Sequence, residues 1–365
     1  MTPITFYIPC LFGLEALVGD ELRRLHLKDI RVENGHVLCC GTVADVARLN
    51  LNLRCGERVL VVLGAFTASS FDALFEQTKA LPWENWIPRD GAFPVKGYSL
   101  DSTQKIIKKA VATRLGAKYG TGQLPETGAK YQIQFGMMND RTALFLDTSG
   151  AGLYKRGYRA VGVRAPLRET LAAAMVTLAR FRGKDPFCDP FCGSGTIAIE
   201  AALIAKNRAP GLDRSFDAQK WKTVPGESWM DAAEEAMDQE YDGNYDIWGG
   251  DSDPKAIAIA RSNAEKAGVE DLVRFEVADA TAFSRSSDYG QLVTNPPYGE
   301  RLLEQEEAGR LYRAFGQAAA ALPEKWRVYI LSSHPEFEAC YGSLAAKKRK
   351  LYNGMIKCDL FMYYR

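Results

Sequence analysis

The chain has 365 residues, of which 47% are hydrophobic and 25% are charged. This composition is typical of a soluble globular protein, and the length exceeds what one ordinary core accommodates. No apolar run approaches the roughly 20 residues that span a bilayer, and the N-terminus lacks the basic-then-apolar pattern of a secretion signal. The eight cysteines lack the spacing of a disulfide scaffold, and with three histidines no metal site is expected. We therefore expect a cytoplasmic protein without membrane or metal contacts.

Charge is distributed unevenly along the chain, although the net charge is only +1. Residues 1–160 carry 20 Lys and Arg against 15 Asp and Glu, whereas residues 161–365 carry 26 against 30. The overall balance excludes a protein that holds nucleic acid by charge alone. A mildly basic N-terminal half nevertheless suits a module that contacts phosphates.

Residues 1–66 are predicted to form a β-α-β-β-α-β unit, the order of a ferredoxin-like domain. Leucines at helical spacing indicate the first helix, and Asn34-Gly35 is a strong signal for a hairpin turn. Thr42 is expected to cap the second helix. The predicted strands are residues 6–9, 31–33, 37–40 and 59–66, and the predicted helices are residues 13–25 and 42–49.

Residues 67–160 are predicted to form a second α+β unit. Ser70 precedes one helix, and a second helix is amphipathic and basic, with Lys105, Lys108 and Lys109. Asn139-Asp140 is expected at a hairpin turn. The unit closes with a stretch that mixes basic and aromatic side chains, residues 154–159. The predicted helices are residues 71–79 and 103–115, and the predicted strands are residues 93–98, 131–138 and 141–147.

The remaining residues alternate between short apolar strands and helical stretches, a pattern that predicts a parallel sheet covered on both faces. The tail differs, because Asn353-Gly354 separates two strands that read as an antiparallel hairpin at the sheet edge. The predicted parallel strands are residues 187–189, 247–250, 273–277, 292–294 and 328–332, and those of the hairpin are residues 349–352 and 355–363.

A glycine-containing loop directly follows the first of these strands and opens a helix: Asp189, Pro190, Phe191, Cys192, Gly193, Ser194, Gly195 and Thr196. Glycines let the backbone turn tightly and approach a ligand closely, and ligands of such sheets bind where strands end. The loop lacks the third glycine of a dinucleotide-binding fingerprint, and no Gly-Lys-Ser/Thr follows to make a phosphate P-loop. A plain glycine-rich turn is the remaining alternative.

This loop looks like the S-adenosylmethionine-binding first motif of class I methyltransferases, in the variant of nucleic-acid amino-methylases. The resemblance implies that a carboxylate after the second strand, Asp251 or Asp253, binds the ribose hydroxyls, with Asp251 favoured. It further implies that Asp279 and Ala280, after the third strand, contact the adenine. The implied cofactor-binding residues are Asp189, Pro190, Phe191, Gly193, Ser194, Gly195, Thr196, Asp251, Asp253, Asp279 and Ala280.

A second motif, Asn295-Pro296-Pro297-Tyr298, follows the fourth strand. Adjacent prolines fix the backbone and leave carbonyls free as acceptors, although a purely structural turn would look the same. In amino-methyltransferases this tetrapeptide faces the methyl donor. We expect the Asn295 side-chain oxygen and the Pro296 carbonyl to accept the two protons of an exocyclic amine, which orients its nitrogen for transfer. Tyr298 is expected to stack on the extruded base.

The whole chain resembles the bacterial THUMP guanine-N2 RNA methyltransferase family, which includes the rRNA enzyme RlmL and stand-alone Gram-positive relatives. The resemblance includes residues 154–159, 165–174 and 297–302. It implies a ferredoxin-like domain (1–66), a THUMP RNA-binding domain (67–160) and a Rossmann-like methyltransferase domain (161–365) with a mostly parallel seven-stranded sheet. It also implies that Glu169 lies near the cofactor. The expected RNA contacts are Lys105, Lys108, Lys109, Lys155, Arg156 and Arg159.

The substrate implied by the resemblance is the N2 amine of a guanine, in 23S rRNA rather than tRNA. Adenine-N6 methylation of DNA, glutamine methylation of protein, and an inert RNA-binding assembly factor are the alternatives. The connection between residues 96 and 104 is shorter than in relatives, so either a loop is truncated or a loop is missing from the sequence.

Overall fold

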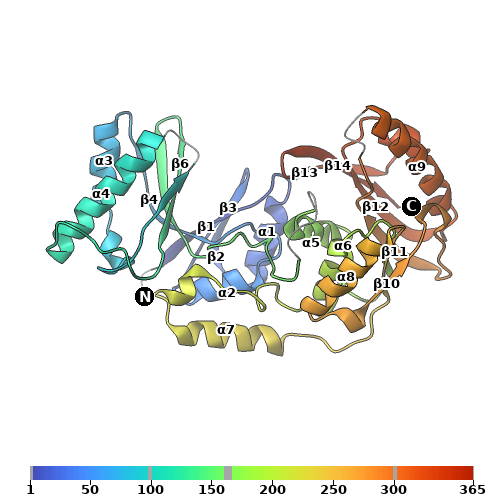
Figure 1. Cartoon of the computed structure of the whole chain (residues 1–365), viewed down its shortest axis with the longest axis horizontal. Helices are drawn as coiled ribbons and strands as arrows, with labels where there is room; N and C mark the ends of the chain where they lie inside the picture. Colours follow the sequence, from blue (N-terminus) through green and yellow to red (C-terminus); the bar gives the residue numbers. More distant parts are fainter. Residues whose placement is uncertain (1–2, 98–100, 160–166, 299–301, 365) are drawn as a thin grey trace. The chain divides into compact units, whose positions relative to one another are not determined.

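Two seven-stranded sheets organise the residues described by the computed structural model, which are 3–97, 101–159, 167–298 and 302–364 (backbone only at 101 and 302–305). The chain divides by its contacts into two units, each built around one sheet (Figure 1). The first unit consists of Met1–Cys10, Val18–Leu153 and Ser215–Glu235, and the second of Leu11–Leu17, Tyr154–Arg214 and Ala236–Arg365. This division does not follow the predicted boundaries at residues 66 and 160.

The sheet of the first unit has the order β2-β3-β1-β4-β7-β6-β5. The predicted β-α-β-β-α-β order is present, and the strands of residues 1–66 and 67–160 form one continuous sheet. They are joined because β4 pairs antiparallel with β7 from Leu60↔Asp147 to Thr67↔Arg141. The strands are β1 (Ile4–Pro9), β2 (Lys28–Glu33), β3 (His36–Gly41), β4 (Leu60–Thr67), β5 (Val95–Gly97), β6 (Gln132–Met138) and β7 (Arg141–Asp147).

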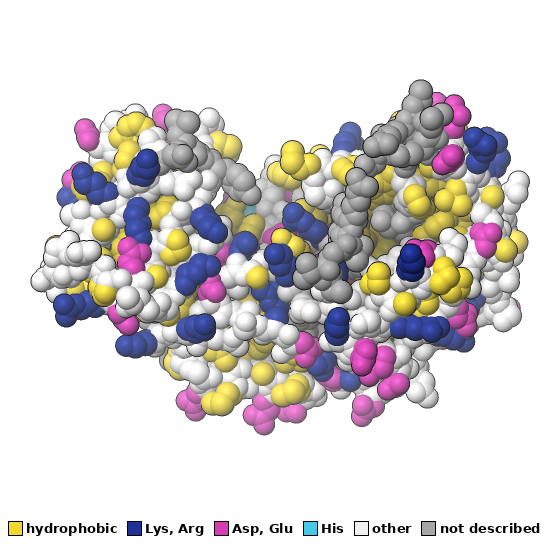
Figure 2. Space-filling view, in the orientation of Figure 1, with side chains coloured by type: hydrophobic (Ala, Val, Ile, Leu, Met, Phe, Trp, Pro, Cys, Tyr) yellow, Lys and Arg dark blue, Asp and Glu magenta, His cyan; other side chains and the backbone are white. Residues whose placement is uncertain are grey.

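Side-chain hydrogen bonds mark the starts of two helices in the first unit. Ser70 caps α3 by accepting a hydrogen bond from the Ala73 amide (3.1 Å), as predicted. The prediction for Thr42 was wrong, because its amide and hydroxyl both donate to the Asp45 carboxylate (2.7 and 2.9 Å) and the helix begins at Asp45. The helices are α1 (Glu15–Arg24), α2 (Asp45–Asn52), α3 (Phe71–Ala80) and α4 (Asp101–Tyr119). Lys and Arg side chains are spread over the face of this unit that Figure 2 shows.

Residues 215–235, which the predicted boundaries include in the methyltransferase domain, group by their contacts with the first unit. Trp221 stacks on Tyr131 with ring centroids 4.6 Å apart and donates its indole N–H to the Lys130 carbonyl (2.8 Å). The Lys130 ammonium also pairs with the Asp217 carboxylate at 2.9 Å. These contacts bury Trp221 and join a late segment of the chain to β6.

The sheet of the second unit has the order β10-β9-β8-β11-β12-β14-β13, and its first five strands run parallel. The hairpin of β13 and β14 pairs antiparallel with β12, as predicted. The strands are β8 (Phe187–Asp189), β9 (Ile247–Asp251), β10 (Val273–Val277), β11 (Tyr289–Thr294), β12 (Lys325–Ser332), β13 (Lys347–Asn353) and β14 (Ile356–Tyr363).

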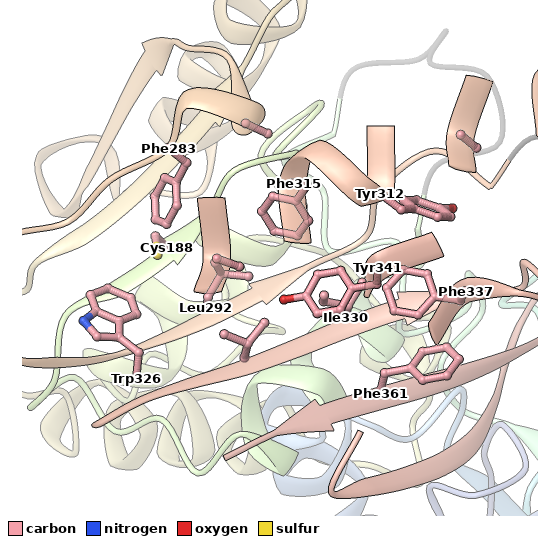
Figure 3. Close-up of a cluster of buried hydrophobic side chains, with 14 of the residues drawn as sticks. Cys188, Phe283, Leu292, Tyr312, Phe315, Trp326, Ile330, Phe337, Tyr341 and Phe361 are labelled. Atoms are coloured by element: carbon pink, nitrogen blue, oxygen red, sulfur yellow. The ribbon is translucent and has the colours of Figure 1, made fainter. Parts of the chain in front are cut away.

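Helices of the second unit form two groups, because α5 and α8 both contact α6, whereas α9 contacts α10 (Figure 1). Figure 3 shows Tyr312 and Phe315 from α9 meeting Phe337 from α10 and Ile330 from β12 in one buried cluster. This cluster covers the half of the sheet that carries β11 and β12. The helices of this unit are α5 (Glu169–Leu178), α6 (Thr196–Ala205), α8 (Pro254–Lys266), α9 (Leu302–Ala320) and α10 (Phe337–Tyr341), whereas α7 (Gly226–Asp238) lies mostly within residues 215–235 of the first unit.

We expect Trp221→Ala to lower the free energy of unfolding of the first unit by about 3–5 kcal/mol, because it removes a buried indole and its hydrogen bond. Urea unfolding, followed together with hydrogen exchange of the β6 amides, measures the change. Phe71→Ala, at an exposed aromatic position of the same unit, is the control and should shift stability by at most about 0.5 kcal/mol. Equal effects of the two substitutions would contradict the assignment of residues 215–235 to this core.

Candidate functional site

The predicted motifs meet at one edge of the second sheet, because the parallel strands β8, β9, β10 and β11 all end there. A cavity of about 570 Å³ opens at this edge. It contains predicted residues from the loops after all four strands. Its lining consists of Arg168, Pro190, Phe191, Gly193, Asp251, Ser252, Asp279, Ala280, Asn295, Pro296, Pro297, Tyr298, Leu311, Asn353, Gly354 and Ile356.

Two positions of the loop after β8, Gly193 and Gly195, require glycine for different structural reasons. Both have positive φ, +51° at Gly193 and +84° at Gly195, which favours glycine. A Cβ at Gly195 would lie 2.8 Å from the Phe275 ring and 3.0 Å from the Ala260 methyl, so this position serves packing. A Cβ at Gly193 would meet nothing within 4 Å, and Gly193 lines the cavity. Gly193 therefore keeps backbone exposed where a ligand could lie.

Asp251 and Asp253, at the end of β9 and just after it, make different contacts. The Asp251 carboxylate accepts hydrogen bonds from the amides of Gly193 (3.0 Å) and Asp253 (2.9 Å), and it lines the cavity. Asp253 caps α8, since its carboxylate accepts from the Lys255 amide (2.8 Å), and it does not line the cavity. Of the two, Asp251 is the carboxylate that can reach a ligand in the cavity.

Asp279 lines the cavity after β10. One of its oxygens accepts hydrogen bonds from the Thr281 amide and hydroxyl, both at 2.8 Å. These bonds lower the pKa of Asp279, so the group is ionised at neutral pH. The cavity thus has a second fixed carboxylate.

Asp189 is a buried carboxylate at the end of β8, with 1% of its surface exposed. Its Oδ1 accepts from the Thr294 hydroxyl (2.6 Å) and from the Phe191 amide (3.2 Å). Its Oδ2 has no hydrogen-bond partner among the described residues. Burial raises the pKa of Asp189 to about 7, because little solvent stabilises the charged form. Asp189 itself does not line the cavity, although Pro190 and Phe191, which follow it in the chain, do. An unpaired buried carboxylate oxygen favours a cationic or N–H donor nearby.

The tetrapeptide after β11 is held at both of its ends. The Tyr312 hydroxyl donates to the Pro297 carbonyl (2.5 Å) and lies 3.3 Å from the Ser332 hydroxyl. The Tyr298 hydroxyl donates to the side-chain oxygen of Asn295. Burial raises the pKa of Tyr298 above its usual range, so this hydroxyl remains a donor at neutral pH. The Asn295 amide is therefore oriented by its neighbour rather than free to rotate.

Three predicted cofactor residues support the loop without lining the cavity. The Ser194 carbonyl accepts from the Asn263 amide group (2.9 Å), and the Thr196 hydroxyl accepts from Arg159 (3.0 Å). Glu169 pairs with Arg159 at 3.3 Å, and burial raises the pKa of Glu169 to about 7. These contacts fix the start of α5 relative to α6.

The predicted RNA contacts differ in their exposure. Arg159 is largely buried and bonds to Glu169 and Thr196. Lys105, Lys109 and Lys155 are exposed. Lys108 is half-buried, bonds to Glu126 at 2.5 Å and lies over the Phe93 ring. Arg156 is only 3% exposed and pairs with the buried Glu200 at 3.4 Å. Burial and pairing contradict the prediction that Arg156 binds RNA, because a phosphate cannot reach its guanidinium.

Part of the cavity wall was not predicted as a site. The hairpin between β13 and β14 contributes Asn353, Gly354 and Ile356, although the sequence indicated only a turn there. Arg168 lies in the segment 165–174 that carries the family resemblance but was not itself predicted as a site residue, and Leu311 was missed because no motif surrounds it. Predicted features at residues 98–100, 165–166 and 299–301 lie outside the described residues.

In the described part of the chain, no cluster of three or more His, Cys, Asp or Glu side chains could hold a metal ion. No helix of that part is both long enough and apolar enough to cross a membrane.

Three family models match this sequence. A model described as an RMKL-like methyltransferase domain matches residues 156–361. A model of the RlmL ferredoxin-like domain matches residues 5–60, and a THUMP domain model matches residues 68–147.

Curated relatives are similar over the full chain. A Bacillus subtilis protein named "Putative RNA methyltransferase YpsC" is 42% identical over 100% of this chain and 97% of its own length. A Syntrophotalea carbinolica protein named ribosomal RNA large subunit methyltransferase K/L is 34% identical over 99% of this chain. The chain spans 53% of that second protein.

Solved structures share the fold over both units. A Listeria monocytogenes protein described as a predicted N6-adenine-specific DNA methylase is 45% identical, with a TM-score of 0.95 and coverage of 100% of this chain and 97% of that one. A structure described as "SMU.472, a putative methyltransferase complexed with SAH" is 39% identical, with a TM-score of 0.94 and coverage of 100% and 98%. The chain therefore belongs to the family of RMKL-like methyltransferases that carry an RlmL ferredoxin-like domain and a THUMP domain.

Proposed function

We propose that this protein uses S-adenosylmethionine to methylate the exocyclic N2 amine of a guanine in RNA, with 23S rRNA as the favoured substrate. The main observation in support is that Asn295, Pro296 and Tyr298 line the same cavity as Asp251 and Asp279. That cavity thus combines acceptors for an amine with carboxylates for a nucleoside-containing cofactor. We keep residues 1–66, 67–160 and 161–365 as the proposed domains, with the THUMP domain binding RNA.

The residues present fit S-adenosylmethionine, whose sulfonium supplies an electrophilic methyl group when it is bound. Asp251 would accept hydrogen bonds from the ribose hydroxyls, since a carboxylate has two acceptor oxygens. Asp279 and Ala280 would contact the adenine, and the unpaired oxygen of Asp189 would accept from the α-ammonium group. Gly193 leaves room for the ligand beside its backbone. Asp253 is a helix cap, so Asp251 is our choice for the ribose.

The amine acceptors are a side-chain oxygen and a carbonyl. An exocyclic amine is a poor nucleophile because its lone pair is delocalised into the ring. The Asn295 oxygen and the Pro296 carbonyl would accept hydrogen bonds from its two N–H groups and direct the nitrogen lone pair toward the methyl group. No strong base is required, because the proton can leave after transfer. The Tyr298 hydroxyl holds the Asn295 amide, and Tyr312 holds the Pro297 carbonyl.

Two observations bear on the substrate. The THUMP match and the names of the curated relatives favour RNA, and the name of the Syntrophotalea protein favours large-subunit rRNA. The description of the Listeria structure instead favours adenine N6 in DNA, which is our second candidate. The same Asn-Pro-Pro-Tyr chemistry serves both amines.

We expect the protein to transfer labelled methyl groups from S-adenosylmethionine to rRNA purified from a strain that lacks the gene. Mass spectrometry of the nucleosides should identify N2-methylguanosine. Asn295→Ala should lower the rate by about a hundredfold or more, because one amine acceptor is lost. Its affinity for S-adenosylhomocysteine, measured by calorimetry, should be unchanged.

Label in tRNA alone would change the substrate to tRNA, and label at adenine N6 of duplex DNA would favour the second candidate. Asn85→Ala, at an exposed asparagine of the first unit, is the matched control and should behave as the wild type. A full rate in Asn295→Ala would contradict the proposed role of Asn295.

The Tyr298 hydroxyl and ring are expected to act separately. Tyr298→Phe keeps the ring but removes the hydrogen bond that orients Asn295, so kcat should fall about tenfold. Tyr298→Ala also removes the stacking surface and should lower kcat further and raise KM for RNA. Steady-state kinetics of both variants measure the split. A wild-type kcat in Tyr298→Phe would show that only the ring matters.

Affinity for S-adenosylhomocysteine should weaken as pH falls through about 7. Burial raises the folded-state pKa of Asp189 to about 7, and the protonated carboxyl no longer attracts an ammonium group. Because the folded state binds this proton more tightly than the unfolded state, the ligand-free protein should lose stability as pH rises toward about 7. Calorimetric titrations across this range measure the affinity.

The matched control for this pH dependence is Glu169, whose pKa burial also raises to about 7. Asp189→Asn should flatten the pH dependence of affinity, whereas Glu169→Gln should retain it. The opposite pattern would assign the effect to the ion pair of Glu169 with Arg159.

A further inference from the structure

The hairpin of β13 and β14 is a basic element in an otherwise acidic part of the chain. Residues 347–359 carry five Lys and Arg against one Asp. The rest of residues 161–365 carries 21 Lys and Arg against 29 Asp and Glu. The strands that lead to the cavity therefore have a net positive charge, whereas the rest of the C-terminal half has a net negative charge.

Several of these basic side chains are available to a partner. Lys347, Lys350 and Lys357 are exposed, and none of them forms a salt bridge within the described ranges. Lys350 and Lys357 lie on the same face of the hairpin, because Lys357 is the cross-strand partner of Tyr352 and Tyr352 is two residues after Lys350. The cross-strand partner of Lys350 is Asp359. Lys348 differs, since it pairs with Glu338 at 2.8 Å. A phosphate backbone is the ligand that complements unpaired lysines of this kind.

The tip of the hairpin carries exposed apolar side chains next to residues that line the cavity. Met355 is 98% exposed, and it lies between Gly354 and Ile356, which both line the cavity. Phe12, 57% exposed, contacts the Tyr352 ring with centroids 6.1 Å apart. Residues 11–17 group with the second unit, and the Arg349 guanidinium holds this loop through the Gly13 carbonyl. The cavity therefore has an apolar rim next to unpaired lysines.

We propose that this hairpin, with Phe12 beside it, is the surface that holds the RNA strand around the target base. Lys350 and Lys357 bind phosphates that flank the target nucleotide, and Met355 inserts into the stack from which the base is extruded. The inference rests on the proposed function, because only a base that leaves its stack requires such an insertion. An apolar side chain that fills the vacated space offsets part of the cost of unstacking.

The two parts of the surface should affect different kinetic constants. Lysines that bind phosphates act on both ground and transition states, so Lys350→Ala combined with Lys357→Ala should raise KM for RNA about tenfold and leave kcat unchanged. The salt dependence of RNA binding should fall by about one unit of slope for each lysine removed. Met355→Ala should lower kcat about tenfold with little change in KM, and Met355→Leu should restore most of the rate.

The substrate for these assays is whichever rRNA or tRNA fraction the wild-type protein labels. The controls are Lys325→Ala, at the amino end of β12 and thus at the opposite edge of the sheet, and Met237→Ala, at an exposed position of α7. Variants of the hairpin that match these controls would overturn the inference while leaving the proposed function intact. Absence of label from both RNA fractions with the wild type would overturn the proposed function, and this inference with it.

Discussion

A single buried hydrogen bond, from the Thr294 hydroxyl to the Asp189 carboxylate, determines how the site is assembled. The strands that these residues end, β8 and β11, pair over only Phe187 and Cys188 against Gln291 and Leu292. The bond extends this pairing to the loops, so that the glycine loop and the Asn-Pro-Pro-Tyr loop start side by side. Its cost is a carboxylate out of contact with water, which is why the pKa of Asp189 rises. A ligand that supplies the missing donor would recover part of that cost.

Buried ion pairs also support the helix α6 that follows the glycine loop. Arg156 pairs with Glu200, and Arg159 pairs with Glu169 and donates to the Thr196 hydroxyl. A buried ion pair of this kind contributes little net stability, since desolvation offsets the attraction, but losing one partner is strongly destabilising. The basic residues of the stretch 154–159 therefore have different roles. Lys155 is exposed, whereas Arg156 fixes α6 in the core.

Local signals made most of the strands and the four loops of the site predictable. Asn-Gly turns, apolar runs and the glycine loop act over a few residues, so the sequence contains them directly. Three features could not be predicted, because each depends on partners far away in the chain. Arg156 looks like an RNA contact until Glu200 is brought beside it. The pairing of β4 with β7 and the stacking of Trp221 on Tyr131 are likewise set by the fold as a whole.

Each unit contains a segment that the chain order assigns to the other. Residues 11–17, between β1 and α1, group with the second unit, and residues 215–235, between α6 and β9, group with the first. The family matches at residues 5–60, 68–147 and 156–361 therefore do not coincide with the two contact units. A fragment that starts at residue 156 would lose the loop on which Arg349 rests and would expose Trp221. The methyltransferase region thus packs against residues 11–17, which precede its own first residue by more than a hundred positions in the chain.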